Sequence, residues 1–209
     1  MTLIQKDTAR EIDMYSWECL EPKILSRGGP VTTAFLHAGL ADFRSAAQWV
    51  CSLPYGRNSD PNAQLIVFTE GRGTCSTKHA LIRRLAIEQR LDVALSIGIY
   101  EMTAQNTPGV GAVLEKYDLK ALPEAHCYLR FGQKRVDLTR FSVRPPTEGI
   151  SSFLHEEDIE PEQIGSYKIK LHRQFLSLWM TRRETIGYNL DELWRIREEC
   201  IAGLSEDHS

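Results

Sequence analysis

The sequence predicts a domain of the α+β class, because its helical and strand segments occupy separate stretches of the chain. Two amphipathic helices come first, three strands follow them, and further helices end the chain. An alternating series of strands and helices would instead predict a parallel α/β sheet. We therefore expect a helix packed on an antiparallel sheet in residues 1–145, and a helical extension packed on the same domain in residues 146–209.

The first helix is predicted over about residues 42–53 by the spacing of its hydrophobic side chains. Phe43, Ala46 and Val50 recur at intervals of three and four residues, which places them on one face of a helix. Pro54 cannot continue the helix, so the helix ends there and a polar loop leads to an apolar run at residues 65–68.

A second helix is predicted over about residues 75–89, where Leu81 and Leu85 belong to one apolar stripe. Gly73 helps to break the chain just before this helix. Thr74 precedes the first helical residue, and its hydroxyl group suits the N-cap position. The helix is therefore expected to begin at Cys75.

Three strands are predicted in the middle of the chain. Residues 93–100 form a continuous apolar run, which is typical of a buried strand. Residues 104–121 make a connection long enough to be functional or to carry a short helix. Residues 125–131 and 134–138 are then joined at Gly132-Gln133, which fits a two-residue hairpin loop of type II′.

Two helices are predicted in the C-terminal part, one from near Pro161 and one over about residues 190–204. The acidic segment before them, residues 155–159, is expected to cap a helix or to form a solvated turn. It begins like the His-Glu-x-x-His motif of zinc proteases, but Ile159 stands where the second histidine is required. It therefore predicts no zinc site.

The composition is that of an ordinary globular domain. The 209 residues are 42% hydrophobic and 25% charged, and the net charge is −3. A protein that binds nucleic acid or an anionic membrane usually has an excess of basic residues, and this chain has none. The chain has neither an N-terminal signal pattern nor an apolar run of membrane-spanning length. We therefore expect a cytoplasmic protein that binds neither nucleic acid nor membrane.

The cysteine pattern argues against a disulfide framework or a structural zinc site. The cysteines are odd in number, widely spaced, and include no CxxC pair. Most of them are expected to be buried thiols, and no metal or other cofactor is predicted. The five are Cys19, Cys51, Cys75, Cys127 and Cys200.

Cys75 differs from the other cysteines because it lies at the first turn of a predicted helix. The free N–H groups and the positive end of the helix dipole favour a thiolate there. A thiolate is the form of cysteine that attacks a carbonyl, and the same N–H groups can help to hold an oxyanion. Cys75 is therefore a candidate nucleophile; the alternative is a buried cysteine that merely begins a helix.

His126 and Asp137 lie on the two strands of the predicted hairpin. With a two-residue loop, Phe131 faces Lys134 and His126 faces Thr139. His126 and Asp137 then project from the same face as diagonal neighbours, whereas a three-residue loop would place them on opposite faces. This register predicts a base oriented by a carboxylate; the alternatives are a structural histidine and a solvated aspartate.

The pattern resembles the transglutaminase-like superfamily of papain-type cysteine enzymes over roughly residues 40–142. The order Cys–His–Asp is that of the family. Two positions depart from it, since Cys127 stands where many members have Trp and Leu138 stands where Pro is frequent. The similar segments are the stretch before the nucleophile, the nucleophile motif, the histidine strand and the aspartate strand: residues 49–57, 73–81, 125–130 and 136–139.

The resemblance implies a papain- or transglutaminase-like core with a catalytic triad of Cys75, His126 and Asp137. It implies hydrolysis or acyl transfer on a peptide, isopeptide, glutamine-type or other small amide substrate, without a cofactor. Arylamine N-acetyltransferases share this triad, but their Arg-Gly-Gly-x-Cys-Phe signature is absent. The alternative is a transglutaminase-like binding module without catalytic activity.

Several further residues lie near this pattern. His79 follows Cys75 by one helical turn, so it could contact the thiol, but it has no acidic partner at a fixed offset. Cys127 is next to His126 and is therefore expected to point the other way, into the core. Three loop residues before the nucleophile are candidates for an oxyanion donor: Tyr55, Arg57 and Asn58.

Overall fold

The computed structural model describes residues 14–26, 28–139, 150, 152–182 and 187–206. Within these parts the chain forms seven α-helices and a mixed, mostly antiparallel sheet of five strands, which confirms the predicted α+β class. The helices are α1 (Pro30–His37), α2 (Phe43–Ser52), α3 (Ile66–Glu70), α4 (Cys75–Glu88), α5 (Gly111–Lys116), α6 (Ser166–Thr181) and α7 (Leu190–Glu206). The strands are β1 (Met14–Tyr15), β2 (Ala94–Met102), β3 (Leu122–Phe131), β4 (Lys134–Val136) and β5 (His155–Ile159), and the short 3-10 helices are η1 (Trp17–Cys19) and η2 (Pro161–Ile164).

The sheet has the strand order β1-β4-β3-β2-β5. β2 pairs antiparallel with β3 and β5, β4 pairs antiparallel with β3, and β1 pairs parallel with β4. Strand β4 pairs only with residues 129–131 of β3. On the side of β3 that faces away from β2, residues 122–128 therefore have no strand beside them among the described residues. His126 lies in this stretch.

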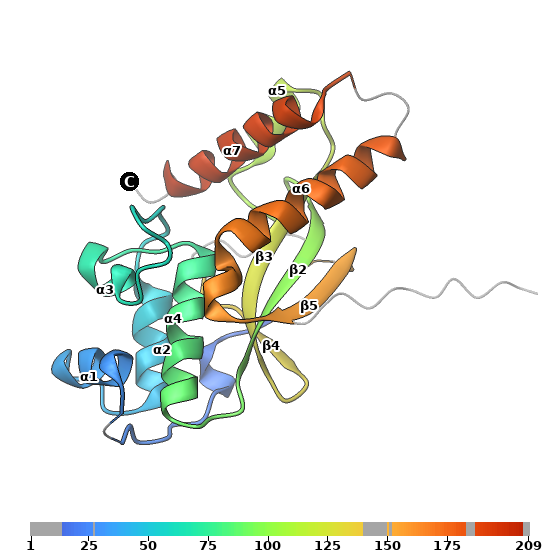
Figure 1. Ribbon diagram of the computed structural model, residues 1–209. Helices are drawn as coiled ribbons and strands as arrows, with labels where there is room; N and C mark the ends of the chain where they lie inside the picture. The colour runs from blue at the N-terminus through green and yellow to red at the C-terminus, as the bar shows by residue number, and fades with distance from the viewer. Residues whose placement is uncertain (1–13, 27, 140–149, 151, 183–186, 207–209) are drawn as a thin grey trace, which may run out of the picture.

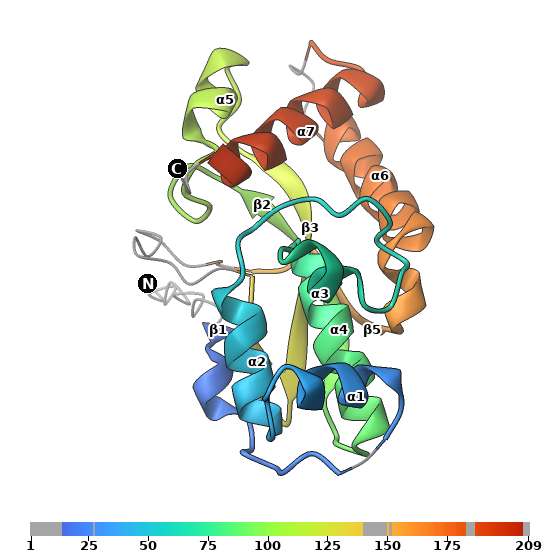
Figure 2. The ribbon, with the colours of Figure 1, turned by 90° about the vertical axis from the view of Figure 1, so that its left-hand side faces the viewer.

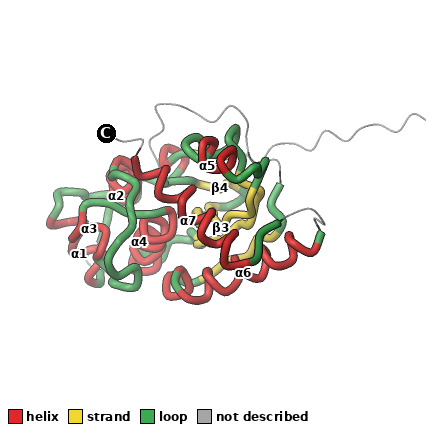
Figure 3. Tube along the Cα trace, turned by 90° about the horizontal axis from the view of Figure 1, so that it is seen from above, coloured by secondary structure: helices red, strands yellow, loops and turns green. Residues whose placement is uncertain are grey.

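The helices form two groups at opposite ends of the long strands β2 and β3. Helices α1 to α4 gather at one end, and α5, α6 and α7 gather at the other (Figures 1 and 2). Figure 3 shows the molecule from above. In this view α6 runs along the side of the strands that is turned towards the viewer in Figure 1. Both α4 and α6 contact β3, so two helices from distant parts of the chain pack on the same strand.

Two hydrophobic clusters correspond to these two groups. Leu122 of β3 belongs to the cluster formed with α5, α6 and α7, whereas Ala125 and Cys127 belong to the larger cluster formed with α1, α2 and α4. Glu124 and His126 therefore lie on β3 at the boundary between the two clusters. In the described parts of the chain, no helix combines the length and the apolar character needed to cross a membrane.

Helix α4 begins at Cys75, as the sequence predicts. The Thr74 side chain accepts a hydrogen bond from the Thr77 backbone N–H, and the Thr77 hydroxyl accepts one from the Thr74 N–H. This reciprocal arrangement is a capping box, which satisfies free donors at the helix start. Leu81 and Leu85 are buried in the larger hydrophobic cluster, which confirms the predicted apolar stripe.

The β3–β4 hairpin has the predicted register. Phe131 pairs with Lys134, and Leu129 pairs with Val136. Gly132 has a φ of +59°, while the following Gln133 does not have a positive φ, as a type II′ turn requires. The final strand is shorter than the predicted span of 134–138, because regular pairing ends at Val136.

The expectation for the acidic segment is wrong, because it forms β5 instead of a cap or turn. Its carboxylates have partners on two other strands of the sheet, β2 and β4, which makes an acidic strand acceptable. Asp158 accepts a hydrogen bond from Ser96 at 2.5 Å, and Glu156 accepts two from Arg135 at 2.8 and 2.7 Å. Residues 146–209 thus contribute a strand to the sheet as well as two helices.

The N-terminal part is more ordered than its sequence indicates. Pro30 is the first residue of α1, where its missing N–H costs nothing. The apolar run that follows the polar loop contributes to the short helix α3. The connection at residues 104–121 carries the short helix α5, which confirms the expectation that it could contain a short helix.

Candidate active site

The loop before α4 holds Cys75 in place through the backbone. Gly73 donates a hydrogen bond to the carbonyl oxygen of Pro54 at 3.2 Å and accepts one from Gly56 at 3.2 Å. A Cβ atom at Gly73 would lie 2.9 Å from the Thr77 hydroxyl, so only glycine allows this close approach. The start of α4 is thereby tied to the loop at residues 54–56.

His126 and Asp137 form the predicted pair. His126 Nε2 lies 3.0 Å from Asp137 Oδ2, across the hairpin. The other carboxylate oxygen accepts a hydrogen bond from the Thr139 N–H at 2.8 Å, and the Asp137 N–H donates to the carbonyl oxygen of Tyr15 at 2.9 Å. Strand β1, which the sequence did not indicate, therefore helps to fix the carboxylate.

The two partners shift each other's pKa. Burial alone would lower the pKa of His126, but the charge and hydrogen bond of Asp137 and the sulfur of Cys75 outweigh burial and raise it to about 10. Burial alone would raise the pKa of Asp137, but His126 holds it well below its usual range. At neutral pH the pair is therefore an imidazolium beside a carboxylate.

The structure brings Cys75 to this pair. The electrostatic shifts couple its sulfur to the His126 ring, whose Nδ1 is not used by the contact with Asp137. A hydrogen bond from Cys127 lowers the pKa of Cys75 most, burial opposes it, and the charges of Lys168 and His126 lower it further. The net effect lowers the pKa of Cys75 well below the usual thiol range, which favours the thiolate.

His79 bridges backbone groups and does not act on the thiol. Its Nδ1 donates to the Cys75 carbonyl oxygen at 2.6 Å, and its Nε2 accepts from the Leu138 N–H at 2.7 Å. Because a carbonyl oxygen only accepts and an N–H only donates, His79 is neutral with its proton on Nδ1. Burial lowers its pKa to about 4. Asp137 lies 3.5 Å from Nε2, which has no proton to donate to it.

The structure adds Lys168 of α6, which sequence reasoning missed. Its Nζ lies 3.6 Å from Cys75 Sγ and 2.7 Å from the Ser76 hydroxyl. Nothing in the local sequence marks this lysine, because it lies 93 residues after Cys75 in a helix with an ordinary apolar face. Only packing of α6 against β3 brings it to the start of α4.

Cys127 belongs to the hydrophobic core, as expected, but its thiol also faces the site. The Ser76 hydroxyl donates to Cys127 Sγ at 3.6 Å and lies 3.8 Å from Cys75 Sγ. The hydrogen bond to Cys75 and burial raise the pKa of Cys127 well above the usual thiol range. Of the two cysteines, Cys127 is therefore the one that favours the thiol.

A buried ion pair of Glu124 and Arg197 lies beside these groups. The Arg197 guanidinium binds both carboxylate oxygens, at 2.7 and 2.6 Å. Burial would raise the pKa of Glu124, but Arg197 outweighs burial and the net shift is downward. The geometry is the bidentate one that arginine and carboxylate favour, so α7 is anchored to β3 at the boundary of the two clusters.

The candidate oxyanion donors of the loop have other partners. Asn58 donates to Glu70 and to the Arg72 carbonyl oxygen, and it accepts from the Thr77 hydroxyl at 2.6 Å. Arg57 forms an ion pair with Glu198. Burial and the charge of the Cys75 sulfur raise the pKa of the third candidate, Tyr55.

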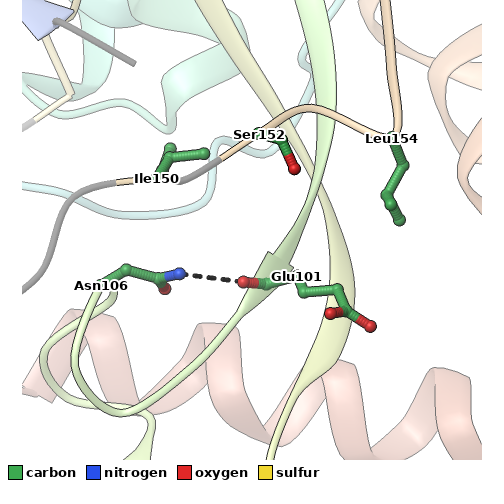
Figure 4. Close-up of a pocket in the computed structure, with 5 residues that line it drawn as sticks. All are labelled: Glu101, Asn106, Ile150, Ser152 and Leu154. Atoms are coloured by element: carbon green, nitrogen blue, oxygen red, sulfur yellow. Dashed lines mark hydrogen bonds between the residues drawn. The ribbon is translucent and has the colours of Figure 1, made fainter. Parts of the chain in front are cut away.

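Cys75 itself is only 7% exposed, and the His126 and Asp137 side chains are 13% and 32% exposed. The site is therefore open mainly on the side of Asp137. A small polar pocket lies elsewhere, at the end of β2, and none of the three residues lines it. Figure 4 shows its lining, in which Asn106 donates to the Glu101 carbonyl oxygen at 2.9 Å: Glu101, Asn106, Ile150, Ser152 and Leu154.

Three observations complete the description of the site. All five cysteines are free thiols. Within the residues that the structure describes, no three His, Cys, Asp or Glu side chains are grouped so that they could hold a metal ion. Comparison of the chain with protein-family models, with curated proteins and with solved structures finds no match.

Proposed function

We propose that the protein is a cysteine enzyme that hydrolyses or transfers the acyl group of an amide. The observation that carries this proposal is the His126–Asp137 pair, electrostatically coupled to the Cys75 sulfur at the start of a capped helix. A buried imidazolium and carboxylate cost desolvation free energy that a purely structural strand would avoid. Strongly shifted pKa values in one cluster are typical of active sites.

In the proposed reaction, the Cys75 thiolate attacks the carbonyl carbon of the amide and forms a C–S bond. His126 donates its proton to the nitrogen of the leaving amine as the C–N bond breaks. A water molecule, or an amine, then gives a proton back to His126 and attacks the thioester, which releases the acid or the new amide and restores the thiolate. Asp137 keeps the imidazole oriented and stabilises its charged form.

The start of α4 supplies the donor for the oxyanion. The Cys75 N–H is at the first position of the helix, where no carbonyl of the preceding turn accepts from it. An oxyanion formed at the attacked carbon lies next to this N–H and to the positive end of the helix dipole. The hydrogen bonds of Gly73 keep this N–H in position relative to the sulfur.

The proposal includes a transglutaminase-like core with a peptide, isopeptide or small amide as substrate. It is supported by the order Cys–His–Asp and by a helix start that meets the edge of an antiparallel pair. We also place the protein in the cytoplasm, since its cysteines are free thiols and a reducing compartment preserves them.

Labelling with iodoacetamide at pH 7, followed by peptide mass spectrometry, tests the nucleophile. We expect Cys75 to be alkylated much faster than the other cysteines, because it alone is a thiolate at neutral pH. Cys75→Ala should abolish this fast labelling, and the matched variant Cys19→Ala, at a cysteine whose pKa no residue of the site shifts, should retain it. If fast labelling persists in Cys75→Ala, the assignment of the nucleophile is wrong.

The small exposed fraction of Cys75 favours one other function, a binding module without catalysis. Turnover separates the two functions. Purified protein is screened against peptide, isopeptide and acyl-amine substrates, with Cys75→Ala as the control. Turnover that disappears in Cys75→Ala supports the enzyme, whereas fast labelling of Cys75 without turnover of any substrate class supports the binding module.

A further inference from the structure

Lys168 is a buried ammonium group that touches the candidate nucleophile. The residue is 7% exposed, and its Nζ lies 3.6 Å from Cys75 Sγ and 2.7 Å from the Ser76 hydroxyl. Burial would lower the pKa of Lys168, but the neighbouring sulfurs and Glu124 outweigh burial and raise it. Lys168 is therefore charged at neutral pH. It cannot act as a base towards Ser76, as the lysine of a Ser–Lys pair would.

The nearby carboxylates already have closer partners. Glu124 is bound on both oxygens by Arg197, at 2.7 and 2.6 Å. Asp137 is bound by His126 at 3.0 Å. A buried cation without an anion is strongly disfavoured, so the charge of Lys168 needs the Cys75 sulfur as its counterion. This need does not depend on the protonation state of His126.

We propose that Lys168 is a second cationic partner of Cys75, which keeps the sulfur a thiolate whether or not His126 is charged. This inference rests on the proposed function, because it concerns the same nucleophile. It separates two tasks that a Cys–His pair usually combines. Lys168 maintains the nucleophile, and His126 is left to deliver the proton to the leaving amine.

Other charged groups around Cys75 and Lys168 also act on this pair. Arg197 repels the ammonium and Glu124 attracts it, while Cys127 donates to the sulfur. None of them replaces Lys168 as a cation in contact with the sulfur. Among the described residues, the charged or titratable side chains that face Cys75 or Lys168 are His126, Cys127 and Glu124 of β3, Tyr100 of β2, His79 of α4, His172 of α6, Arg197 of α7, Asp137 and Tyr55.

The test follows the titration of Cys75 in the intact protein. The thiolate is measured by its absorbance near 240 nm as the difference from a Cys75→Ser variant, and independently by the pH dependence of alkylation at Cys75. In His126→Ala we expect the thiolate to persist at pH 7. In Lys168→Met, which keeps the length of the side chain without its charge, the midpoint should rise by about 1–3 pH units. Lys168→Arg should restore most of the low midpoint.

The outcomes distinguish this inference from the proposed function. If wild-type Cys75 has an ordinary thiol midpoint of about 8.5, the nucleophile and the role of Lys168 are both wrong. If the midpoint is low in wild type, becomes ordinary in His126→Ala and is unchanged in Lys168→Met, only the role of Lys168 is wrong. Should Lys168→Met fail to fold, His126→Ala and Lys168→Arg still decide, because a thiolate lost in His126→Ala overturns the inference.

Discussion

The two ends of α4 both carry buried polar side chains, but they use them differently. At the C-terminal end, Gln89 accepts from the N–H and hydroxyl of Ser26 and donates to its carbonyl oxygen and to Thr32, at 2.9 to 3.1 Å. Glu88 accepts from the backbone N–H groups of Val31 and Thr32, at 3.1 and 2.6 Å. These contacts cap α1 and join it to α4, so the polar groups serve stability.

At the N-terminal end, the polar groups are ionisable and face one another. Cys75, His126, Asp137 and Lys168 shift each other's pKa values in directions that create a thiolate beside two cations. Buried hydrogen bonds to backbone groups stabilise a fold, whereas a cluster of buried ionisable groups that shift one another's pKa values is typical of an active site. Mutations at the two ends should therefore separate activity from stability.

The largest expected effect is that of Asp137→Asn on turnover. Asparagine keeps the shape of the side chain but removes the charge that orients and stabilises the His126 imidazolium, so kcat/KM should fall by about 10²–10⁴-fold. The measurement uses an amide substrate that the wild type turns over, with urea unfolding as the control for folding. A loss of less than tenfold in a folded variant would contradict the positioning role of Asp137.

The next effect concerns His79 and the stability of the fold in acid. The pKa of His79 is about 4 in the folded protein and about 6.5 in the unfolded chain, so the unfolded state binds the proton first as pH falls. This histidine therefore contributes stability above pH 6.5 that is lost between pH 6.5 and 4, by about 3 kcal/mol. His79→Gln keeps an acceptor and a donor without titrating. The stability of this variant, followed by urea unfolding, should fall less over the same range, and an equal fall would count against the assignment.

The smallest effect is that of Gln89→Ala, at the other end of the helix. The variant loses four hydrogen bonds and leaves the Ser26 backbone groups without their partner, so the free energy of unfolding should fall by about 2 kcal/mol. The rate of alkylation at Cys75 should stay within about twofold of wild type, since no charge near the sulfur changes. Gln48→Ala, at an exposed position of α2, is the matched control. A large change in alkylation would show that the two ends are coupled.

Local sequence determined the elements that carry the candidate triad. The Thr74 N-cap and the apolar stripe set where α4 begins, because capping and amphipathic spacing act within a few residues. Gly132 set the two-residue turn, and the turn alone fixed the register that places His126 and Asp137 on one face. These features depend on neighbours in the chain, so they could be predicted from it.

Tertiary structure alone decided what surrounds the sulfur. Lys168 approaches Cys75 from 93 residues away, and Cys127 turns its thiol to the same sulfur although it belongs to the core. The acidic strand β5 formed because partners on β2 and β4 satisfy its carboxylates. The reason is physical: a pKa depends on the charges and burial around a group in space, and these arise only when distant helices pack on one strand.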